Sequence, residues 1–306
     1  MSLDLVIAGN LLVDDIVYPD GRTRMGEAGG AALYMALAAS LWDARVGIAS
    51  VRGDDYPIAA LDALAQRGVD LEGVRALGGP GVRTWLLYEE GGRRVIHRLG
   101  APSHAAVSPS PADFPAHYRE ARAIHLAPMP FEIQEALVAA LSSRRETALS
   151  LDPHEPIRED NVAAWRPLLE HVDALFVSED ELRLASAVLD PRAALRALGG
   201  AGGRLRFVVF KRGRNGGLLY DARERAFIEW PPVPRISGDP TGAGDAFAGG
   251  FLAAIVAGRP LETALDQAIV SASFALEGWG ADGLLAATRE EAERRRREWL
   301  GSKAER

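Results

Sequence analysis

The stretch GDPTGAGDAFAGGF, residues 238–251, joins a proline-stiffened turn to an apolar helical pattern. Gly242, Ala243 and Gly244 lie where the helix begins, so their backbone N–H groups lack intrahelical acceptors and face the same way as the positive end of the helix dipole. A helix start of this kind binds anions. The small side chains leave the backbone bare, and Asp-Pro-Thr at residues 239–241 stiffens the entry. The stretch therefore predicts a ligand-binding turn at a helix N-terminus.

Asp245 stands in the first turn of this predicted helix, and two interpretations fit its position. In the first, the carboxylate caps the helix, because it satisfies unpaired N–H groups and suits the helix dipole. Capping alone does not need three consecutive small residues. In the second interpretation Asp245 therefore faces a bound ligand. The spacing by itself leaves both interpretations open.

The composition limits the classes of function. The 306 residues are 48% hydrophobic, enough to bury a substantial core, and indicate a soluble globular enzyme. The formal net charge of -7 disfavours nucleic acid and anionic membranes as partners. The absence of cysteine excludes disulfides and thiolate chemistry and fits a cytoplasmic location. The opening MSLDLVIAGN lacks the features of a signal peptide, and no apolar run is long enough to span a bilayer.

Apolar runs and helical patterns alternate along the chain. The runs LDLVIAG, RVGIASV, RAIHLAP, TALSLDP, DALFVS and RFVVFK read as strands, separated by helical stretches such as FEIQEALVAALSSRR. Such runs are typical of a parallel sheet covered on both faces. In contrast, TWLLYEEGGRRVIHR, residues 84–98, reads as an antiparallel hairpin turning at Gly91 and Gly92. We expect a single α/β domain over residues 1–306, with a mostly parallel central sheet flanked by helices and a small β appendage.

Several common motifs are absent or have simpler explanations. The sequence lacks GxGxxG at the first βα turn and lacks GxxxxGK[ST], which argues against the two common nucleotide motifs. The six histidines are scattered without ligand spacing, so we expect no dedicated transition-metal site. Four arginines at residues 294–297 follow REEAE and are interpreted as a solvated helix face. GGAGGR, residues 199–204, is interpreted as a connection between a helix and a strand.

Two distant segments carry a resemblance to a known family. DPTGAGDAFAGGFLAAI, residues 239–255, resembles the C-terminal signature of the ribokinase (phosphofructokinase-B) family of carbohydrate kinases, and GEAGGAALYMALAASLWDARVGIASVRGDD, residues 26–55, resembles its N-terminal Gly-Gly signature. Between them, VRTWLLYEEGGRRVIHRLGA resembles the family's lid strands, and FVSEDELRL resembles its Asn-x-x-Glu segment. The resemblance spans nearly the whole chain and implies a ribokinase-like fold, with a lid formed by about residues 11–28 and 82–100.

The resemblance implies transfer of the γ-phosphoryl group of ATP to a hydroxyl. Asp245 then accepts the hydroxyl proton. The N–H groups of Gly242, Ala243 and Gly244 hold the negative charge that develops on the phosphoryl oxygens.

The same resemblance assigns the nucleotide and metal groups. Glu181 matches the family's magnesium-organising glutamate, where the alternative is an ordinary exposed helical Glu, and Mg²⁺ bridges the phosphates mostly through water. Ser178 replaces the family's usual Asn, which puts direct contact with phosphate or water at that position in doubt. Lys211, Gly213 and Gly216 match the loop that borders the nucleotide.

The acceptor and a monovalent cation are assigned in the same way. Asp14 matches the carboxylate that grips acceptor hydroxyls, where the alternative is a loop Asx-turn. Gly29 and Gly30 let the acceptor approach the backbone and hinge the lid. Tyr34 either stacks on an acceptor ring or packs in the core. In many members a K⁺-type site involves residues matching Asp239 and Thr241.

The resulting hypothesis is an ATP-dependent kinase acting on a small sugar or polyol. The alternatives are a nucleoside kinase of the same family and a catalytically silent relative that binds a small ligand. A third is a dinucleotide-dependent oxidoreductase, although the sequence lacks the GxGxxG fingerprint of that class. A charged acceptor would need an arginine clamp, but arginines on exposed strands usually keep edges soluble, so a neutral acceptor is favoured. The candidate clamp residues are Arg22, Arg24, Arg83 and Arg98.

The hairpin also predicts a homodimer. Trp85, Leu87, Val95 and His97 occupy alternating positions, and we expect them to share one apolar face that needs cover. A small sheet standing off a core seldom buries such a face alone.

Overall fold

Apolar strands pair into a nine-stranded sheet in the computed structural model, which describes residues 2–89, 92–200, 203–233 and 239–304. The sheet order is β15-β14-β13-β11-β9-β8-β1-β4-β5. All neighbours are parallel except at one edge, where β14 pairs antiparallel with both β13 and β15. The strands are β1 (Leu5–Ala8), β4 (Val46–Arg52), β5 (Val74–Ala76), β8 (Ala123–Leu126), β9 (Ala148–Leu151), β11 (Ala174–Ser178), β13 (Phe207–Lys211), β14 (Gly217–Asp221) and β15 (Ala226–Trp230). The mostly parallel sheet predicted from the apolar runs is confirmed.

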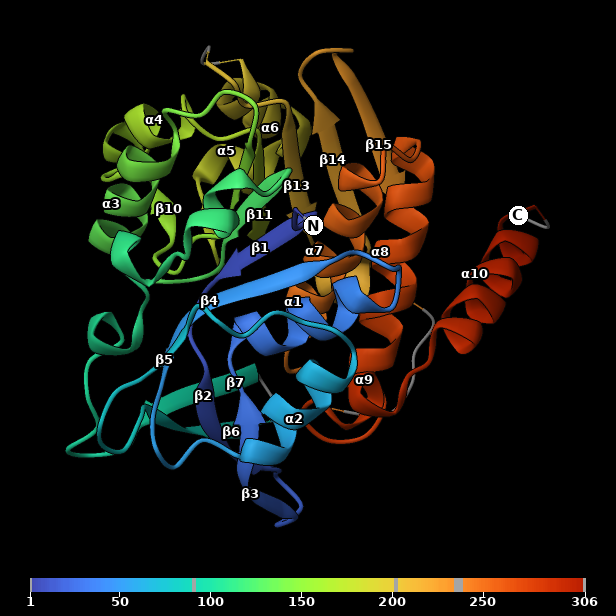
Figure 1. Cartoon of the computed structure of the whole chain (residues 1–306). Coiled ribbons are helices and arrows are strands. Elements are labelled where there is room, and N and C mark those ends of the chain that lie inside the picture. Colours follow the sequence, from blue (N-terminus) through green and yellow to red (C-terminus); the bar gives the residue numbers. More distant parts are fainter. Residues whose placement is uncertain (1, 90–91, 201–202, 234–238, 305–306) are drawn as a thin grey trace.

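Helices cover both faces of this sheet (Figure 1). Alternate residues of β1 belong to different cores: Leu5 and Ile7 pack in one, and Val6 and Ala8 in the other. The first core contains α1 (Ala31–Ser40), α2 (Ile58–Gln66), α7 (Ala243–Val256), α8 (Leu261–Ala275), α9 (Asp282–Ala286) and α10 (Arg289–Ala304). The second contains α3 (Phe131–Leu141), α4 (Val162–Leu169), α5 (Ala185–Leu189) and α6 (Pro191–Gly199). The remaining short elements are η1 (Ala105–Val107), η2 (Pro111–Asp113), η3 (Ala116–Glu120), η4 (Gly213–Asn215), β10 (Ile157–Arg158) and β12 (Leu182–Arg183).

Two glycines of the opening stretch serve helix packing. A Cβ at Gly249 would lie 2.4 Å from the carbonyl oxygen of Met35 on α1, and a Cβ at Gly250 would lie 2.4 Å from Oγ of Ser271 on α8. Helix α7 therefore touches both neighbours closely, and any side chain at these positions would push them apart. This packing fixes the direction in which the first turn of α7 points.

A second, four-stranded sheet stands off the main sheet and is called here the small sheet (Figure 1). Its order is β3-β2-β6-β7, from the segments that the sequence assigned to a lid. Strands β6 and β7 form the predicted antiparallel hairpin. Gly91, in the turn of this hairpin, lies outside the described residues. So do Ala201 and Gly202 of the segment 199–204, and Gly238 of the segment 238–251. The strands are β2 (Leu12–Val17), β3 (Thr23–Gly29), β6 (Arg83–Glu89) and β7 (Gly92–His97).

The register of the hairpin corrects the predicted apolar face. Trp85 pairs with Ile96, and Leu86 pairs with Val95. Partners in register share a face, so Trp85 and Leu87 lie with Ile96, whereas Val95 and His97 lie on the opposite face with Leu86. The expectation that Val95 and His97 share a face with Trp85 was wrong. The turn sets a register in which odd-numbered residues of β6 pair with even-numbered residues of β7, so Val95 and His97 point to the other face.

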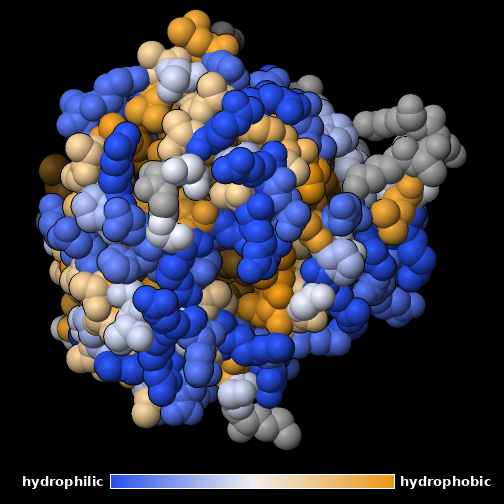
Figure 2. Space-filling view, turned by 90° about the horizontal axis from the view of Figure 1, so that it is seen from above, coloured by the Kyte–Doolittle hydropathy of each residue, from blue (hydrophilic) through white to orange (hydrophobic). Residues whose placement is uncertain are grey.

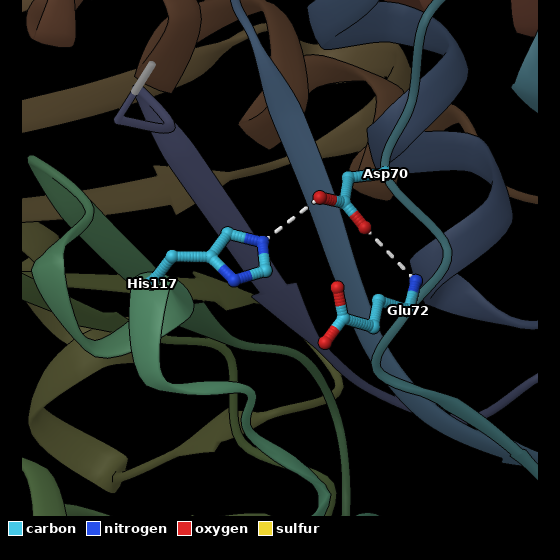
Figure 3. Close-up of side chains that lie close together, drawn as sticks. All are labelled: Asp70, Glu72 and His117. Atoms are coloured by element: carbon cyan, nitrogen blue, oxygen red, sulfur yellow. Dashed lines mark hydrogen bonds and ion pairs between the residues drawn. The ribbon is translucent and has the colours of Figure 1, made fainter.

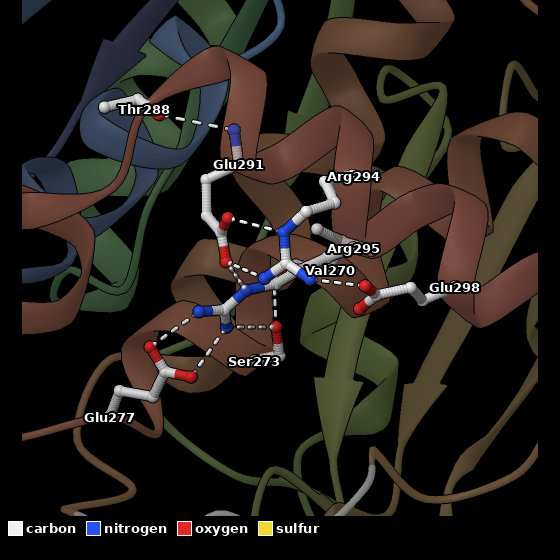
Figure 4. A network of polar contacts seen from close by, with 8 residues as sticks. All are labelled: Val270, Ser273, Glu277, Thr288, Glu291, Arg294, Arg295 and Glu298. Carbon is white, nitrogen blue, oxygen red and sulfur yellow. Dashed lines mark hydrogen bonds and ion pairs between the residues drawn. The ribbon is translucent and has the colours of Figure 1, made fainter.

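The arginines of α10 pair with acids, as predicted for a solvated face. Arg294 contacts Glu291 and Glu298, and Arg295 contacts Glu291 and Glu277 (Figure 4). Arg295 also reaches Oγ of Ser273 on α8. The run therefore attaches α10 to α8 and is not a free basic patch.

One face of the molecule is shown in Figure 2. Hydrophilic residues cover most of the face shown in Figure 2, with apolar residues interspersed. Among the described residues, no helix has the length and apolar character needed to cross a membrane.

Candidate active site

Helix α7 begins at Gly242, whose φ of +74° is a left-handed conformation that favours glycine. The N–H of Ala243 donates to the carbonyl of Pro240 at 3.2 Å. Within the described part of the chain, the N–H groups of Gly242 and Gly244 have no backbone acceptor. The turn therefore offers these two N–H groups to an anion, whereas that of Ala243, the third one predicted, is already engaged in shaping the turn.

The ring of Tyr34 packs against this turn at Gly242. Its side chain is 2% exposed, and a Cβ at residue 242 would lie 2.1 Å from a carbon atom of its ring. Tyr34 is also part of the first core, so of the two interpretations of this residue the structure favours packing in the core. Its contact with an acceptor stays a prediction.

The turn opens on a cavity of about 1000 Å³. Residues from the ends of β11 and β13 and from the first turn of α7 line it, because the carboxyl ends of parallel strands meet at one edge of a sheet. The structure thus brings together predicted residues from three distant segments. Those lining the cavity are Ser178, Glu181, Lys211, Gly213, Gly216, Gly242, Ala243, Gly244 and Asp245.

Charged side chains surround Asp245. Burial raises its pKa to about 6; the positive charge of Lys211 opposes this shift, and Glu181 adds to it. The Lys211 amine donates to Oδ2 of Asp152 at 2.7 Å. Although burial disfavours its charge, Asp152 and Glu181 keep the pKa of Lys211 above its ordinary value. Asp152 was missed by the sequence analysis because nothing local in SLDPHE marks it as the partner of Lys211.

Glu181 is held in place by local geometry. Its Oε2 accepts the backbone N–H of Ser178 at 2.7 Å, which explains the three-residue spacing of this segment. The carboxylate therefore faces the cavity from a fixed position beside Lys211. One carboxylate beside the N–H groups of the turn suits Mg²⁺, which keeps several waters and takes its other ligands from phosphates.

Asp14 lies beside the predicted Gly-Gly pair. A Cβ at Gly29 would lie 1.9 Å from Oδ2 of Asp14, and a Cβ at Gly30 would lie 2.2 Å from the carbonyl oxygen of Asn10. Gly30 also has a φ of +96°. Both glycines are therefore needed to leave room for Asp14 and its loop. Burial raises the pKa of Asp14 to about 7, with Arg93 lowering it and Asp239 raising it further.

Asp239 and Thr241 connect the turn to the small sheet. The Tyr88 hydroxyl, on β6, donates to Oδ1 of Asp239 at 2.6 Å and also contacts the Thr241 hydroxyl. Asp239 accepts the N–H groups of Thr241 and Gly280 as well, both at 3.0 Å. Tyr88 was not singled out from the sequence, because its role depends on the contact between two sheets.

Arg93 is a second residue that the sequence analysis missed. It lies on β7 opposite Tyr88 in the register and lines the same cavity as Asp245. Its charge lowers the pKa values of both Asp14 and Asp245. Arg93 therefore brings a positive charge from the small sheet to the two carboxylates.

Three of the four predicted clamp arginines are paired with carboxylates. Arg83 makes two bonds of 2.7 Å to Asp15, and Arg22 pairs with Asp20. Arg24 pairs with Glu27 and Asp282. These contacts favour a structural role for the three arginines over a clamp for a charged acceptor. Arg98 contributes its charge to Asp15.

One group of possible metal ligands occurs among the described residues. Asp70, Glu72 and His117 lie near one another (Figure 3). Nε2 of His117 is 2.9 Å from Oδ2 of Asp70, and Oδ1 accepts the N–H of Glu72 and the hydroxyl of Tyr118. Asp70 bridges to Gly47 beside the amino end of β4, so the group sits away from the carboxyl edge where the cavity lies. These bonds attach η3 to the loop after α2.

The chain is similar to several known proteins. A model of the pfkB family carbohydrate kinases matches residues 11–286. A cytidine kinase from Thermococcus kodakarensis is 35% identical over 283 residues, which cover 91% of this chain and 98% of that protein.

Two solved structures resemble the fold. The nucleoside kinase of Burkholderia thailandensis in complex with inosine has a TM-score of 0.76 at 19% identity, covering 97% of this chain and 98% of that one. Ribokinase from Arabidopsis thaliana, complexed with ribose and ATP, has a TM-score of 0.73 at 20% identity, covering 96% and 98%. At these identities the likeness is one of fold, and it agrees with the fold expected from the sequence.

The two buried carboxylates predict a pH profile for phosphoryl transfer. Burial raises the pKa of Asp14 to about 7 and that of Asp245 to about 6. The roles predicted for them require both groups to be ionised, so kcat/KM should be full above the higher pKa and fall as the pH drops through each pKa in turn. Steady-state rates at a series of pH values measure this. In Asp14→Asn the residual activity should follow the lower pKa alone. A wild-type kcat/KM that stays constant through both pKa values contradicts the assignment.

Proposed function

The chain belongs to the pfkB family of carbohydrate kinases, and from this premise we propose that it transfers the γ-phosphoryl group of ATP to a hydroxyl of a nucleoside. The observation that carries the choice of acceptor is the 35% identity to a cytidine kinase over 91% of the chain. The sequence alone favoured a sugar or polyol and held the nucleoside as the alternative. A nucleoside contains a sugar, so the role of Asp14 toward hydroxyls is kept.

The residues of the cavity support this reaction. Asp245 accepts the proton of the attacking hydroxyl. The hydroxyl oxygen bonds to the γ-phosphorus while the bond between that phosphorus and the ADP oxygen breaks. The N–H groups of Gly242 and Gly244 stabilise charge on the phosphoryl oxygens, and Arg93 adds a positive charge from the small sheet. Mg²⁺, held near Glu181, supplies charge neutralisation of the phosphates when bound. The small sheet is proposed to act as the lid that excludes water.

An acceptor panel tests the proposal. ADP release with Mg·ATP should be fastest, in kcat/KM, with a nucleoside such as cytidine or inosine, compared with ribose, a polyol and a sugar phosphate. A nucleoside fills the site with a base as well as a sugar and so contributes more binding energy. A sugar phosphate or polyol with the highest kcat/KM would overturn the nucleoside assignment. Binding of ATP without turnover on any acceptor would identify a catalytically silent relative.

Asp245→Asn is the matched control for this assay. The substitution keeps the shape of the side chain and removes the proton acceptor, so kcat should fall by about 10²–10⁴ while ATP still binds. Calorimetry with ATP checks the binding. Turnover close to wild type would show that Asp245 is a helix cap and that the mechanism is wrong.

A monovalent cation such as K⁺ is proposed at Asp239 and Thr241. Asp239 already accepts bonds from Tyr88, Thr241 and Gly280, so backbone carbonyls must supply most of the ligands. Activity should rise when K⁺ replaces a bulky organic cation at constant ionic strength. Equal rates in the two salts would remove the cation from the proposal.

We also propose that the protein is a homodimer joined through the small sheet. Trp85 is 38% exposed and Ile96, its partner in register, is 45% exposed, so this outer face leaves apolar surface in water. Light scattering at micromolar concentration should report a dimer, and Trp85→Ser with Ile96→Ser should report a monomer. A wild-type chain that is monomeric under these conditions rejects the proposal.

A further inference from the structure

Three histidines from separate segments of the chain, one of them on the small sheet, have rings in contact with one another. His97 lies on β7, His104 lies between β7 and η1, and His154 follows β9. The rings of His97 and His104 meet edge to face, with centroids 4.7 Å apart, and those of His104 and His154 stack at 5.2 Å. The description of the histidines as scattered, taken from their spacing in the sequence, is corrected for these three, called here the histidine cluster.

The cluster continues a row of side chains that starts at Asp14. Asp14 on β2 pairs in register with Thr84 on β6, and Thr84 pairs with His97 on β7. Partners in register share a face, so the three side chains lie on one face of the small sheet. Thr84 is 3% exposed, and its Oγ1 has no hydrogen-bond partner among the described residues. The row therefore contains a buried polar group that is still without a partner.

His104 is attached to the loop that precedes β2, the strand of Asp14. The amide nitrogen of Asn10 lies 3.3 Å from Nδ1 of His104, and the amide oxygen lies 2.9 Å from Oγ of Ser108. An amide NH₂ group only donates, so Nδ1 accepts and the ring proton sits on Nε2. Nε2 is buried and has no partner among the described residues. His104 thus holds a buried donor without a partner, on a ring that is bonded to the loop before β2.

The rings of the cluster are suited to a neutral, planar ligand. Burial lowers the pKa of His104 to about 4, and burial also lowers that of His154. Uncharged imidazoles do not attract a phosphate or carboxylate, but they stack on flat aromatic rings. A metal ion is disfavoured, since the only closely spaced ligand group in the described residues is Asp70, Glu72 and His117.

We infer that the histidine cluster binds the base of the acceptor nucleoside, with Nε2 of His104 donating to an oxygen or ring nitrogen on the edge of the base and the rings of His97 and His154 packing against it. The inference rests on the proposed nucleoside kinase activity and adds the residues that select the acceptor. Asp14 then holds the sugar hydroxyls, and the row through Thr84 leads from the sugar to the base.

His104→Phe tests the hydrogen bond, because it keeps a ring of similar shape and removes Nε2–H. The KM and the calorimetric Kd for cytidine and inosine should rise at least tenfold, while kcat and the Kd for ATP change little, since a site built to bond a base loses most when that bond is missing. His97→Ala on the exposed strand β7 tests the ring contact without opening a core cavity and should also raise the KM for nucleosides.

His171→Ala is the matched control, because His171 is exposed just after α4 and lies outside the cluster. It should leave both KM and Kd unchanged. If the wild type phosphorylates nucleosides but His104→Phe and His97→Ala leave nucleoside KM and Kd unchanged, or lower kcat alone, the inference is wrong and the nucleoside kinase activity stands. If the wild type neither binds nor phosphorylates cytidine or inosine, the proposed function fails and the inference fails with it.

Discussion

One buried carboxylate joins the parts that build the active site. Asp239 has no exposed surface, and its oxygens accept bonds from the hydroxyl of Tyr88 and the N–H groups of Thr241 and Gly280. A carboxylate buried without partners would cost several kcal/mol of stability, and these donors offset that cost. Because they belong to β6, to the turn before α7 and to the loop after α8, a single charge fixes the small sheet against the turn before α7.

Paired charges also organise the cavity next to this turn. Lys211 pairs with Asp152 below the turn and places a positive charge next to Asp245, while Arg93 approaches from the small sheet. The charges are therefore positioned before any substrate arrives, which lowers the reorganisation needed when phosphoryl charge develops. The raised pKa of Asp245 follows from this enclosure, because burial outweighs the nearby amine. A base enclosed in this way also titrates closer to neutral pH than an exposed aspartate does.

The sequence predicted features that depend on local pattern. The glycine turn before α7, the apolar strands and the hairpin are encoded within a few residues each, and the signatures placed Asp245, Lys211 and Glu181 in one cavity. Contacts between distant segments were not predictable in this way. Asp152 and Arg93 became visible only through the sheet order and the strand register. The sequence left two interpretations of Tyr34 open, because a ring beside a Gly-Gly pair fits both a pocket wall and a support for the turn, and its 2% exposure favours the support.

The charge distribution around the small sheet bears on which acceptor fits. Arg83 is bonded to Asp15 and Arg24 to Glu27, so these cations are neutralised by their own strands and are poor clamps for a charged acceptor. Arg93 instead lines the cavity that contains the catalytic turn, where phosphates are expected. The face that continues from Asp14 through Thr84 ends at the histidine cluster, in which burial lowers the pKa values of His104 and His154. A positive side for the phosphates and an uncharged aromatic side for the acceptor match a nucleoside better than a sugar phosphate, because only the nucleoside presents a flat neutral ring beside its hydroxyls.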